Sequence, residues 1–412
     1  MKMRKLSRRG FLSGAAVTAG TSALAACSTA GEGGNGALSP EEVEVRLKNQ
    51  TVSFDGQHQA GIATPGQALV NLVGFNFVED MDKTKLVNLM RSWTEDARRL
   101  CSGQAPVGSL EPEMAVTPAN LTITCGFGPK VFDIAGKGEL RPEWLRPIPK
   151  FTRDQLDPAW GQTDIVLQIC CDDSLTLAHA VRHMIRSSSW YVKTAWMQQG
   201  FANADGAKAP DQTARNLFGQ VDGTVNPKTP EDFDYQVWID EGEEWALGGS
   251  AMVVRRIRMN VDTWEMLDRG SREQTIGRDL AKGAPLSGGE EHTIADFSAT
   301  DKYGLPLIDP ASHMARARPT REHPEQALLR RPYSYDLPPE PGSDQLSNSG
   351  LIFICFQKDP DKQFTPIQTR LDEQDRLNEW ITHIGSSVFF IPPGVSADGS
   401  EPDAFWGERL LT

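Results

Sequence analysis

The sequence predicts an α+β fold with antiparallel sheets rather than a doubly wound parallel sheet. Short apolar runs that are typical of strands alternate with amphipathic helical patterns in both halves of the chain. The two halves share no recognisable sequence repeat. A chain of 412 residues exceeds what one ordinary hydrophobic core accommodates, so its length favours two domains.

In the first half, apolar runs predict three strands, and apolar residues repeated every three or four positions predict two helices. The strands are expected at residues 67–77, 121–126 and 164–170, and the helices at residues 82–101 and 174–187. A Pro- and Gly-rich segment, residues 206–230, follows and is expected to connect the two halves.

In the second half, the same patterns predict four strands and two helices. The strands are expected at residues 235–240, 251–260, 350–357 and 387–391, and the helices at residues 261–269 and 373–384. Two long polar tracts, residues 275–331 and 338–348, are expected to form loops, and long loops in a compact protein are usually functional or disordered.

The N-terminus has the features of a targeting segment. A basic stretch contains the pair Arg8-Arg9 in a context that fits the twin-arginine export pattern. The apolar stretch that follows, residues 12–26, is rich in small residues and too short for a transmembrane helix. Residues 1–27 are therefore predicted to be a signal peptide, and the protein is expected outside the cytoplasm.

Two signals for cleavage compete at the end of this segment. Leu24-Ala25-Ala26-Cys27 is similar to a lipobox, in which Cys27 is lipidated and becomes the mature N-terminus. Stable attachment to a membrane requires more than one acyl chain. Cleavage after Ala25 would instead release a periplasmic or secreted protein. In the lipidated form, residues 28–45 would act as a flexible tether.

The overall composition excludes some functions. A net charge of −13 disfavours nucleic acid or an acidic polymer as a partner. Five of the six cysteines follow Cys27, and they lack the CxxC spacing of zinc or iron–sulfur sites. Most are predicted to be buried thiols. The sequence leaves open whether the protein is a monomer or a homo-oligomer.

A loop acid is the most informative feature of the chain. Asp222 lies in the stretch from Arg215 to Pro227, between Gly219 and Gly223. Glycine and proline permit or enforce special backbone angles, so the carboxylate of Asp222 is expected to be held in one position. A fixed carboxylate can accept a proton and return it.

This stretch resembles the GxxDG motif of dye-decolorizing peroxidases, and further segments of that family follow in the same order. The resemblance runs from about residue 53 to the C-terminus and points to the twin-arginine-exported branch related to deferrochelatases. The segments that carry it are Thr122 to Asp133, Asp164 to Ile169, Asp309-Pro-Ala-Ser-His313, Leu328-Leu-Arg330-Arg331-Pro-Tyr333-Ser-Tyr335 and Ser349-Gly-Leu351-Ile-Phe353.

The resemblance implies two ferredoxin-like domains, at residues 46–230 and 231–412, with antiparallel sheets and peripheral helices. It also implies one haem b per chain, held mainly by the second domain. His313 would be the axial iron ligand, and Leu351 and Phe353 would cover the haem. An acid should hold the other ring nitrogen of His313. Asp375 matches the family position best; its rivals are Asp372, Glu373 and Glu379.

On the distal side of the haem, the resemblance implies that Asp222 transfers the proton of hydrogen peroxide and that Arg330 stabilises the developing negative charge. The assignment of Arg330 depends on register, because Arg331 is adjacent and would point the other way in an extended segment. Dyes or other aromatic donors would supply the electrons. Tyr333, Tyr335 and some of the 10 tryptophans are candidate electron-transfer steps.

Three other functions remain to be weighed. The deferrochelatase branch suggests release of iron from haem, and a lipoprotein that only binds ligands is a further alternative. His179 and His183 have the i, i+4 spacing of two zinc ligands, but Ala180 replaces the glutamate that a HExxH site needs. That pair therefore favours an ordinary helix over a metal site.

Overall fold

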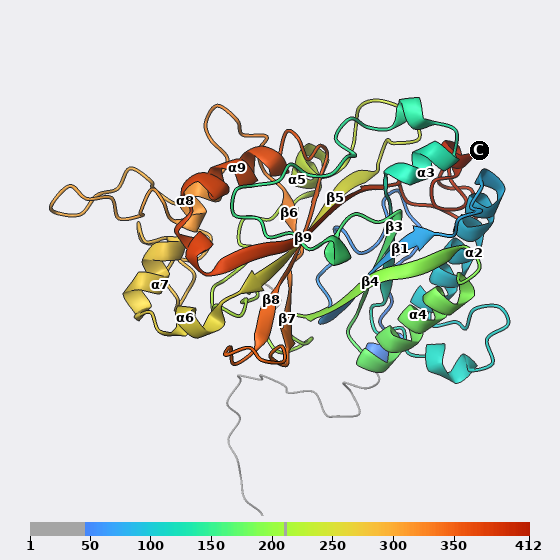
Figure 1. Ribbon diagram of the computed structural model, residues 1–412, viewed down its shortest axis with the longest axis horizontal. Helices are drawn as coiled ribbons and strands as arrows, with labels where there is room; N and C mark the ends of the chain where they lie inside the picture. Colours follow the sequence, from blue (N-terminus) through green and yellow to red (C-terminus); the bar gives the residue numbers. More distant parts are fainter. Residues whose placement is uncertain (1–45, 210–211) are drawn as a thin grey trace, which may run out of the picture.

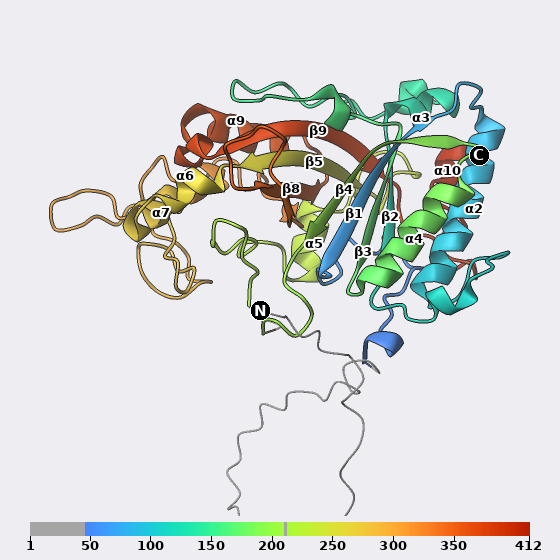
Figure 2. The ribbon, with the colours of Figure 1, turned by 60° about the horizontal axis from the view of Figure 1, so that its bottom comes forward.

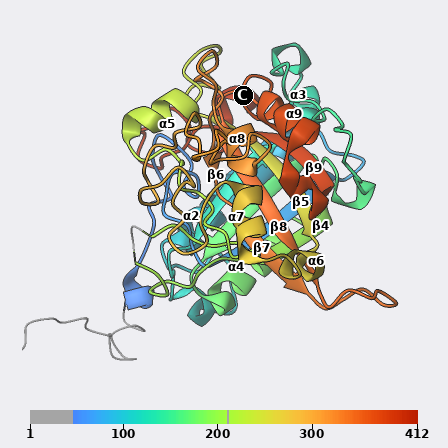
Figure 3. The same cartoon turned by 90° about the vertical axis from the view of Figure 1, so that its left-hand side faces the viewer.

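The computed structural model describes residues 46–209 and 212–412. The predicted signal peptide, Cys27 and the predicted tether lie outside these residues. Two antiparallel sheets, one in each half of the chain, lie face to face, and the main helices of the two halves gather at opposite ends of the molecule (Figures 1 and 3). Among the described residues, no helix is long and apolar enough to cross a membrane.

The first sheet has the strand order β2-β3-β1-β4, with every neighbouring pair antiparallel. A β-α-β-β-α-β chain in this order is the ferredoxin-like arrangement. Its elements are β1 (Leu69–Phe77), α2 (Lys83–Cys101), β2 (Thr122–Phe127), β3 (Ile165–Cys171), α4 (Ser174–Ser187) and β4 (Val192–Phe201).

The second sheet repeats the same topology. Strand β5 lies between β9 and β8, and both β7 and the two-residue strand β6 pair with the other edge of β8. Its elements are β5 (Ser250–Met259), α6 (Val261–Glu265), α7 (Arg269–Ile276), α8 (His313–Ala317), β6 (Leu329–Arg330), β7 (Tyr333–Leu337), β8 (Asn348–Gln357), α9 (Phe364–Gln374) and β9 (Ile381–Ile391).

Shorter helices complete the chain. They are η1 (Pro112–Ala115), α3 (Pro129–Ile134), η2 (Gly138–Leu140), η3 (Pro158–Trp160), α5 (Pro230–Gln236), η4 (Arg376–Glu379) and α10 (Glu408–Leu411). The two sheets touch through single residue pairs, Phe127 with Phe390 and Phe201 with Ser334. The strands therefore close into a ring, and the α+β fold with two ferredoxin-like sheets is confirmed.

The first sheet is covered on its outer face by α2 and α4 (Figure 2). Each helix begins at an aspartate: Asp82 accepts a hydrogen bond from the N–H of Lys85, and Asp173 accepts one from Thr176, both at 2.8 Å. Such caps satisfy N–H groups that have no partner within the helix. The apolar stripe of α2, including the fully buried Trp93, packs into the core.

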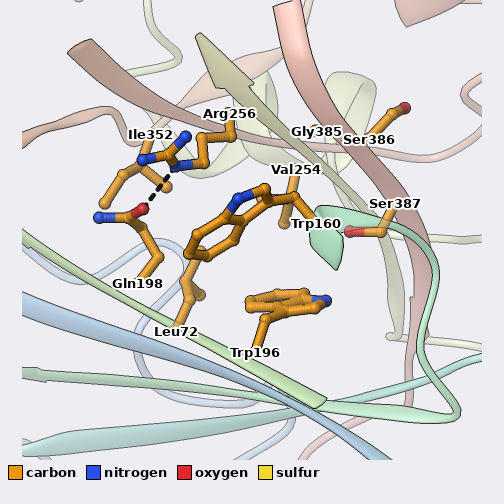
Figure 4. Close-up of a pocket in the computed structure, with 10 residues that line it drawn as sticks. All are labelled: Leu72, Trp160, Trp196, Gln198, Val254, Arg256, Ile352, Gly385, Ser386 and Ser387. Carbon is orange, nitrogen blue, oxygen red and sulfur yellow. Dashed lines mark hydrogen bonds between the residues drawn. The ribbon is translucent and has the colours of Figure 1, made fainter. Parts of the chain in front are cut away.

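The space between the two sheets is closely packed. Arg256 stacks on Trp160, 4.3 Å from its ring centre, and donates to Gln198 at 2.6 Å (Figure 4). These residues and Trp196 line a cavity of only about 20 Å³. A cavity of this size holds at most one water molecule. Side chains from both sheets pack together here, so this part of the interior is a hydrophobic core.

Several elements differ from the prediction. The strand expected at residues 235–240 is not formed, because Thr229 caps a helix whose first residue is Pro230, and α5 continues to Gln236. Strand β4 was not predicted, because lysine, threonine and glutamine interrupt its apolar residues. Its backbone nevertheless pairs along β1 over its full length.

The helix expected at residues 373–384 is also wrong. Asp375 has an extended backbone (φ −69°, ψ 124°), which ends α9 and starts the short helix η4. From Ile381 onward the chain is strand β9, which pairs with β5 over ten residue pairs. Residues 261–269, expected as one helix, form α6 and the start of α7.

Candidate active site

Asp222 lies in a tight turn between β4 and α5. The N–H of Asp222 donates to the carbonyl of Ala214, and that of Gly219 donates to Asn216, both at 2.9 Å. Gly219 and Gly223 have φ angles of 76° and 117°, which residues with a Cβ atom rarely adopt. The turn therefore needs both glycines, and it holds the partly buried carboxylate of Asp222 in place.

Arg330 reaches Asp222 from strand β6. Its Nη1 lies 3.5 Å from Oδ1 of Asp222, and the two side chains are 21% and 16% exposed. This distance makes an ion pair but is too long for a close hydrogen bond. Within the described part of the chain, Asp222 has no other ion-pair partner. Its carboxylate is thus free to accept a proton while it remains next to a fixed positive charge.

Arg331 faces the opposite way. Its guanidinium donates to the carbonyls of Thr64 at 2.6 Å and Pro65 at 3.1 Å, in the first half of the chain. It also binds the side chain of Gln67 and is 7% exposed. Consecutive residues of an extended segment point to opposite faces. The structure therefore brings Arg330, and not Arg331, to Asp222.

His313 is the first residue of α8 and is held by Asp375. Its Nδ1 lies 2.6 Å from Oδ2 of Asp375, and the side chains are 29% and 1% exposed. Oδ1 of the same carboxylate accepts a hydrogen bond from the N–H of Leu377 at 2.9 Å. Both oxygens of Asp375 are thus occupied. Nε2 of His313 makes no hydrogen bond with any described residue and is the nitrogen left to bind a ligand.

The electrostatic surroundings of His313 include groups from both sides of the site. Burial is the largest single influence and lowers the pKa of His313, but the charge and hydrogen bond of Asp375 together outweigh it and raise the pKa overall. Arg330 and Asp222 also act on this imidazole. Phe218, from the loop that carries Asp222, and Leu377, whose N–H binds Asp375, pack in one hydrophobic cluster, so the two pairs lie near each other.

The other acids near residue 375 have different partners. Asp372 accepts hydrogen bonds from the N–H and Oγ1 of Thr152, at 2.9 and 2.7 Å, and one from the N–H of Arg153. Glu373 forms an ion pair with Arg316 at 2.9 Å. Glu379 is exposed. Of the four candidate acids, the structure brings only Asp375 to His313.

The turn that carries Asp375 is tied to the loop before His313. The N–H of Arg376 donates to the carbonyl of Ala311 at 2.9 Å, and its side chain forms an ion pair with Asp309 at 2.5 Å. Asp309 in turn accepts a hydrogen bond from the N–H of Ala311. These contacts fix the distance between two segments that are 62 residues apart in sequence.

Leu351 and Phe353 lie on the face of β8 that Arg330 shares. Arg330 pairs with Cys355 in the sheet, and residues two apart on a strand point to the same face. Both side chains are half-buried, whereas Ile352 and Ile354, on the inner face, are at most 1% exposed. Phe353 packs against Phe364 of α9, with 6.2 Å between ring centres. These two residues supply an apolar wall to the site.

A buried ion pair lies on the same face of the second sheet. Arg255 and Asp154 form a salt bridge in which both side chains are fully buried. Nη1 of Arg255 donates to Ser386 at 3.1 Å, and its Nε lies 3.4 Å from Nδ1 of His383. Burial, followed by the charges of Arg255 and His313, holds the pKa of His383 well below its ordinary value. Sequence reasoning gave none of these residues a role.

Other residues singled out in the sequence lie away from this site. His183 is bound to Asp96 at 2.9 Å, and no cluster of metal-binding side chains occurs among the described residues. The five described cysteines are free and buried, as predicted, and burial raises the pKa of Cys171 to about 12. Tyr333 and Tyr335 are at most 2% exposed, so neither can be a surface site for oxidation.

The site has two chemically distinct sides that fit a haem. On one side, a histidine with a carboxylate on Nδ1 has Nε2 free, which is the donor arrangement of a proximal haem ligand. On the other side, a carboxylate and a guanidinium are placed to move a proton and to stabilise negative charge. The donor set of the site thus suits the class of oxidoreductases that use haem.

Comparison with known proteins identifies the family within this class. The models for the N-terminal and C-terminal parts of Dyp-type peroxidases match residues 59–202 and 213–396. A solved DyP-type peroxidase from Cellulomonas bogoriensis is 46% identical, with a TM-score of 0.84 over 89% of this chain and 99% of its own.

Curated relatives agree with this match. The dye-decolorizing peroxidase of Thermobifida fusca (strain YX) is 35% identical over 94% of each chain. The deferrochelatase of Escherichia coli (strain K12) is 34% identical over 91% of this chain and 90% of its own. The chain belongs to the DyP-type peroxidases, a family of haem-dependent oxidoreductases.

Proposed function

We propose that this protein holds one haem b through His313, reduces hydrogen peroxide and oxidises dyes or other aromatic donors. One observation carries the proposal: one hydrophobic cluster, which includes Phe218 of the Asp222 loop and Leu377 beside Asp375, brings the His313–Asp375 pair and the Asp222–Arg330 pair near each other. A protein that merely binds a ligand has no need of a proton acceptor and a fixed cation opposite its metal ligand.

Each residue then has a defined task. Bound haem supplies the redox chemistry of peroxide reduction. Asp375 keeps the proton of His313 on Nδ1, so that Nε2 remains available to the iron. Asp222 takes the proton from one peroxide oxygen and delivers it to the other, which leaves as water. Arg330 stabilises the negative charge that develops on the departing oxygen, because its guanidinium presents several N–H donors in a rigid geometry.

The assignment of His313 is tested by replacing it with alanine. His313→Ala is expected to lose stable haem binding, measured as the Soret absorption of protein purified after haem addition. His323→Ala is the matched control, because His323 is an exposed histidine whose partner is Glu325 and should not affect haem. A normal Soret band in His313→Ala would assign the iron to another ligand.

Release of iron from haem is a second candidate function. The observation that favours it is the similarity to the Escherichia coli deferrochelatase over nine-tenths of both chains. Both functions need haem in the same site, so they are separated by their products. Fluorescent free protoporphyrin, formed when the protein is incubated with haem in the absence of peroxide, would support iron release.

We also propose that the protein is exported by the twin-arginine pathway and anchored to a membrane through Cys27. The support is the Arg8-Arg9 pair, the lipobox-like sequence before Cys27 and the polar stretch between Cys27 and the first described residues. A twin-arginine route also suits a cofactor protein, since that pathway carries folded proteins.

A further inference from the structure

Asn226 holds the backbone of Arg330 at two points. Its Oδ1 accepts a hydrogen bond from the N–H of Arg330 at 3.0 Å, and its Nδ2 donates to the carbonyl of Arg330 at 2.6 Å. The two residues are 104 positions apart. Asn226 belongs to the loop that carries Asp222, whereas Arg330 is the last residue of β6.

The position of Arg330 in the sheet explains why this contact matters. The N–H of Arg331 donates to the carbonyl of Ile354, so Arg331 and Ile354 form the hydrogen-bonded pair of the ladder. Arg330, opposite Cys355, is in the alternate pair, and its own N–H and carbonyl point away from β8. The carboxamide of Asn226 satisfies both groups, as a neighbouring strand would.

The loop around Asn226 is shaped for this contact. The N–H of Asn226 donates to the carbonyl of Gly223 at 3.0 Å, which closes a turn directly after Asp222. A Cβ atom on Gly223 would lie 3.5 Å from Nδ2 of Asn226, and the φ angle of 117° also favours glycine there. One short turn thus presents the carboxylate of Asp222 and the carboxamide of Asn226 to the same arginine.

We propose that Asn226 is a positioning residue that fixes Arg330 relative to Asp222, so that one side-chain amide sets the spacing of the two distal groups. The inference rests on the proposed peroxidase function. The inference extends that function, because it makes the placement of Arg330 depend on a residue that does not touch the reacting atoms.

Two substitutions separate the two hydrogen bonds. Asn226→Ala removes both. Asn226→Asp is nearly isosteric, but an ionised carboxylate can only accept, so it repels the carbonyl of Arg330. A protonated carboxyl group has one donor and one acceptor and can restore both bonds. Asn226→Asp should therefore recover as the pH falls, whereas Asn226→Ala should not.

A control distinguishes positioning from general loss of stability. Asp82 caps α2, in the first half of the chain, by accepting a hydrogen bond from the N–H of Lys85 at 2.8 Å, and it makes no hydrogen bond with the loop of Asp222 or with β6. Asp82→Ala should lower the melting temperature without altering the distal side. All variants share the charged groups around the distal loop, which are Asp222, Glu291, Arg278 and Arg330. Dividing each variant's rate by the wild-type rate at the same pH therefore cancels the effect of these groups on the pH dependence.

The first measurement does not depend on haem or activity. Hydrogen exchange of the haem-free protein, followed by mass spectrometry on peptides spanning Arg330, should show exchange about 10-fold faster at that amide in Asn226→Ala. Asp82→Ala should leave it unchanged. Equal protection in wild type and Asn226→Ala would show that the carboxamide does not hold the Arg330 backbone.

The second measurement is the rate of reaction of the haem-loaded protein with hydrogen peroxide, by stopped flow between about pH 4 and 7. Asn226→Ala should be slower than wild type by about 10- to 100-fold at every pH, since small displacements of a catalytic group have costs of this size. For Asn226→Asp, the ratio of its rate to that of wild type should rise as the pH falls.

The outcomes separate this proposal from the peroxidase function. If Asn226→Ala reacts as fast as wild type, or if the ratio for Asn226→Asp is the same at all pH values, Asn226 does not position Arg330. If wild type itself fails to react with peroxide, the peroxidase function is wrong. The hydrogen-exchange result then still decides whether the two-point contact exists.

Discussion

Replacing Asp375 with asparagine should force His313 into a tautomer that binds iron poorly. Asp375 uses Oδ2 for Nδ1 of His313, at 2.6 Å, and Oδ1 for the N–H of Leu377, at 2.9 Å. Both partners are donors, and asparagine has only one acceptor oxygen. If that oxygen caps Leu377, the amide NH₂ faces Nδ1 of His313, and the ring proton moves to Nε2, where iron should bind.

The magnitude follows from the contact that is lost. A hydrogen bond to a charged group contributes about 1.5 to 3 kcal/mol. At about 1.4 kcal/mol for each factor of ten, haem affinity should fall roughly 10- to 150-fold. This range agrees with the roughly 10- to 100-fold losses found when the partner of a metal-bound histidine is removed.

The assay is titration of the haem-free protein with haemin, followed at the Soret band. Asp372→Asn is the matched control, because Asp372 is a neighbouring carboxylate that binds Thr152 and Arg153 and does not contact His313. It should keep wild-type affinity. Wild-type affinity in Asp375→Asn, or an equal loss in both variants, would refute the argument from the tautomer.

Three further predictions concern the distal side, stability and the anchor. Asp222→Asn should slow the reaction with peroxide by on the order of 10²- to 10⁴-fold and remove the carboxylate's contribution from the pH–rate profile. Arg330→Leu should lower the rate evenly across pH, because guanidinium does not titrate there. Stopped-flow kinetics measures both rates. His58 stacks on Trp238 with 3.8 Å between ring centres, and burial lowers the pKa of its imidazole below the ordinary value of 6.5. The unfolded chain therefore takes up a proton on His58 more readily than the folded protein, so stability should fall as the pH drops below about 6.5. His58→Phe keeps an aromatic ring stacked on Trp238, and its melting temperature should depend less on pH below about 6.5. An unchanged dependence would show that other groups cause the loss of stability at low pH. Cys27→Ala should move the exported protein from the detergent phase to the aqueous phase in a phase-separation assay, and wild type already in the aqueous phase would instead favour cleavage after Ala25.

Local patterns were sufficient for much of the fold. Helices α2 and α4 were predicted closely, because their apolar periodicity is strong and an aspartate caps each one. Strand β4 was missed, because only Val192, Trp196, Gln198 and Gly200 turn inward, and its pairing with β1 overrides a polar sequence. The strand propensity of single residues is a weak guide to structure where pairing with a neighbouring strand determines whether a strand forms.

Only those features of the candidate site that depend on one continuous segment could be predicted from the sequence. The glycines around Asp222 mark a constrained turn in the sequence itself, and the structure has positive φ at both. The choice of Asp375 over Asp372 could not be made locally, because it depends on which carboxylate the turn after α9 directs toward α8. Asn226 was visible within the distal stretch, but its partner is a backbone 104 residues away, which no side-chain pattern records.

The opposed directions of Arg330 and Arg331 have a consequence for how the protein is assembled. Arg331 is buried against carbonyls and Gln67 from the first half of the chain, and a buried guanidinium without such partners would be strongly unfavourable. The extended segment is therefore held by contacts with the first half of the chain as well as by its pairing with β8. Because Arg330 is the preceding residue, the placement of this cation depends on contacts that Arg331 makes with Thr64, Pro65 and Gln67, none of which has a catalytic task.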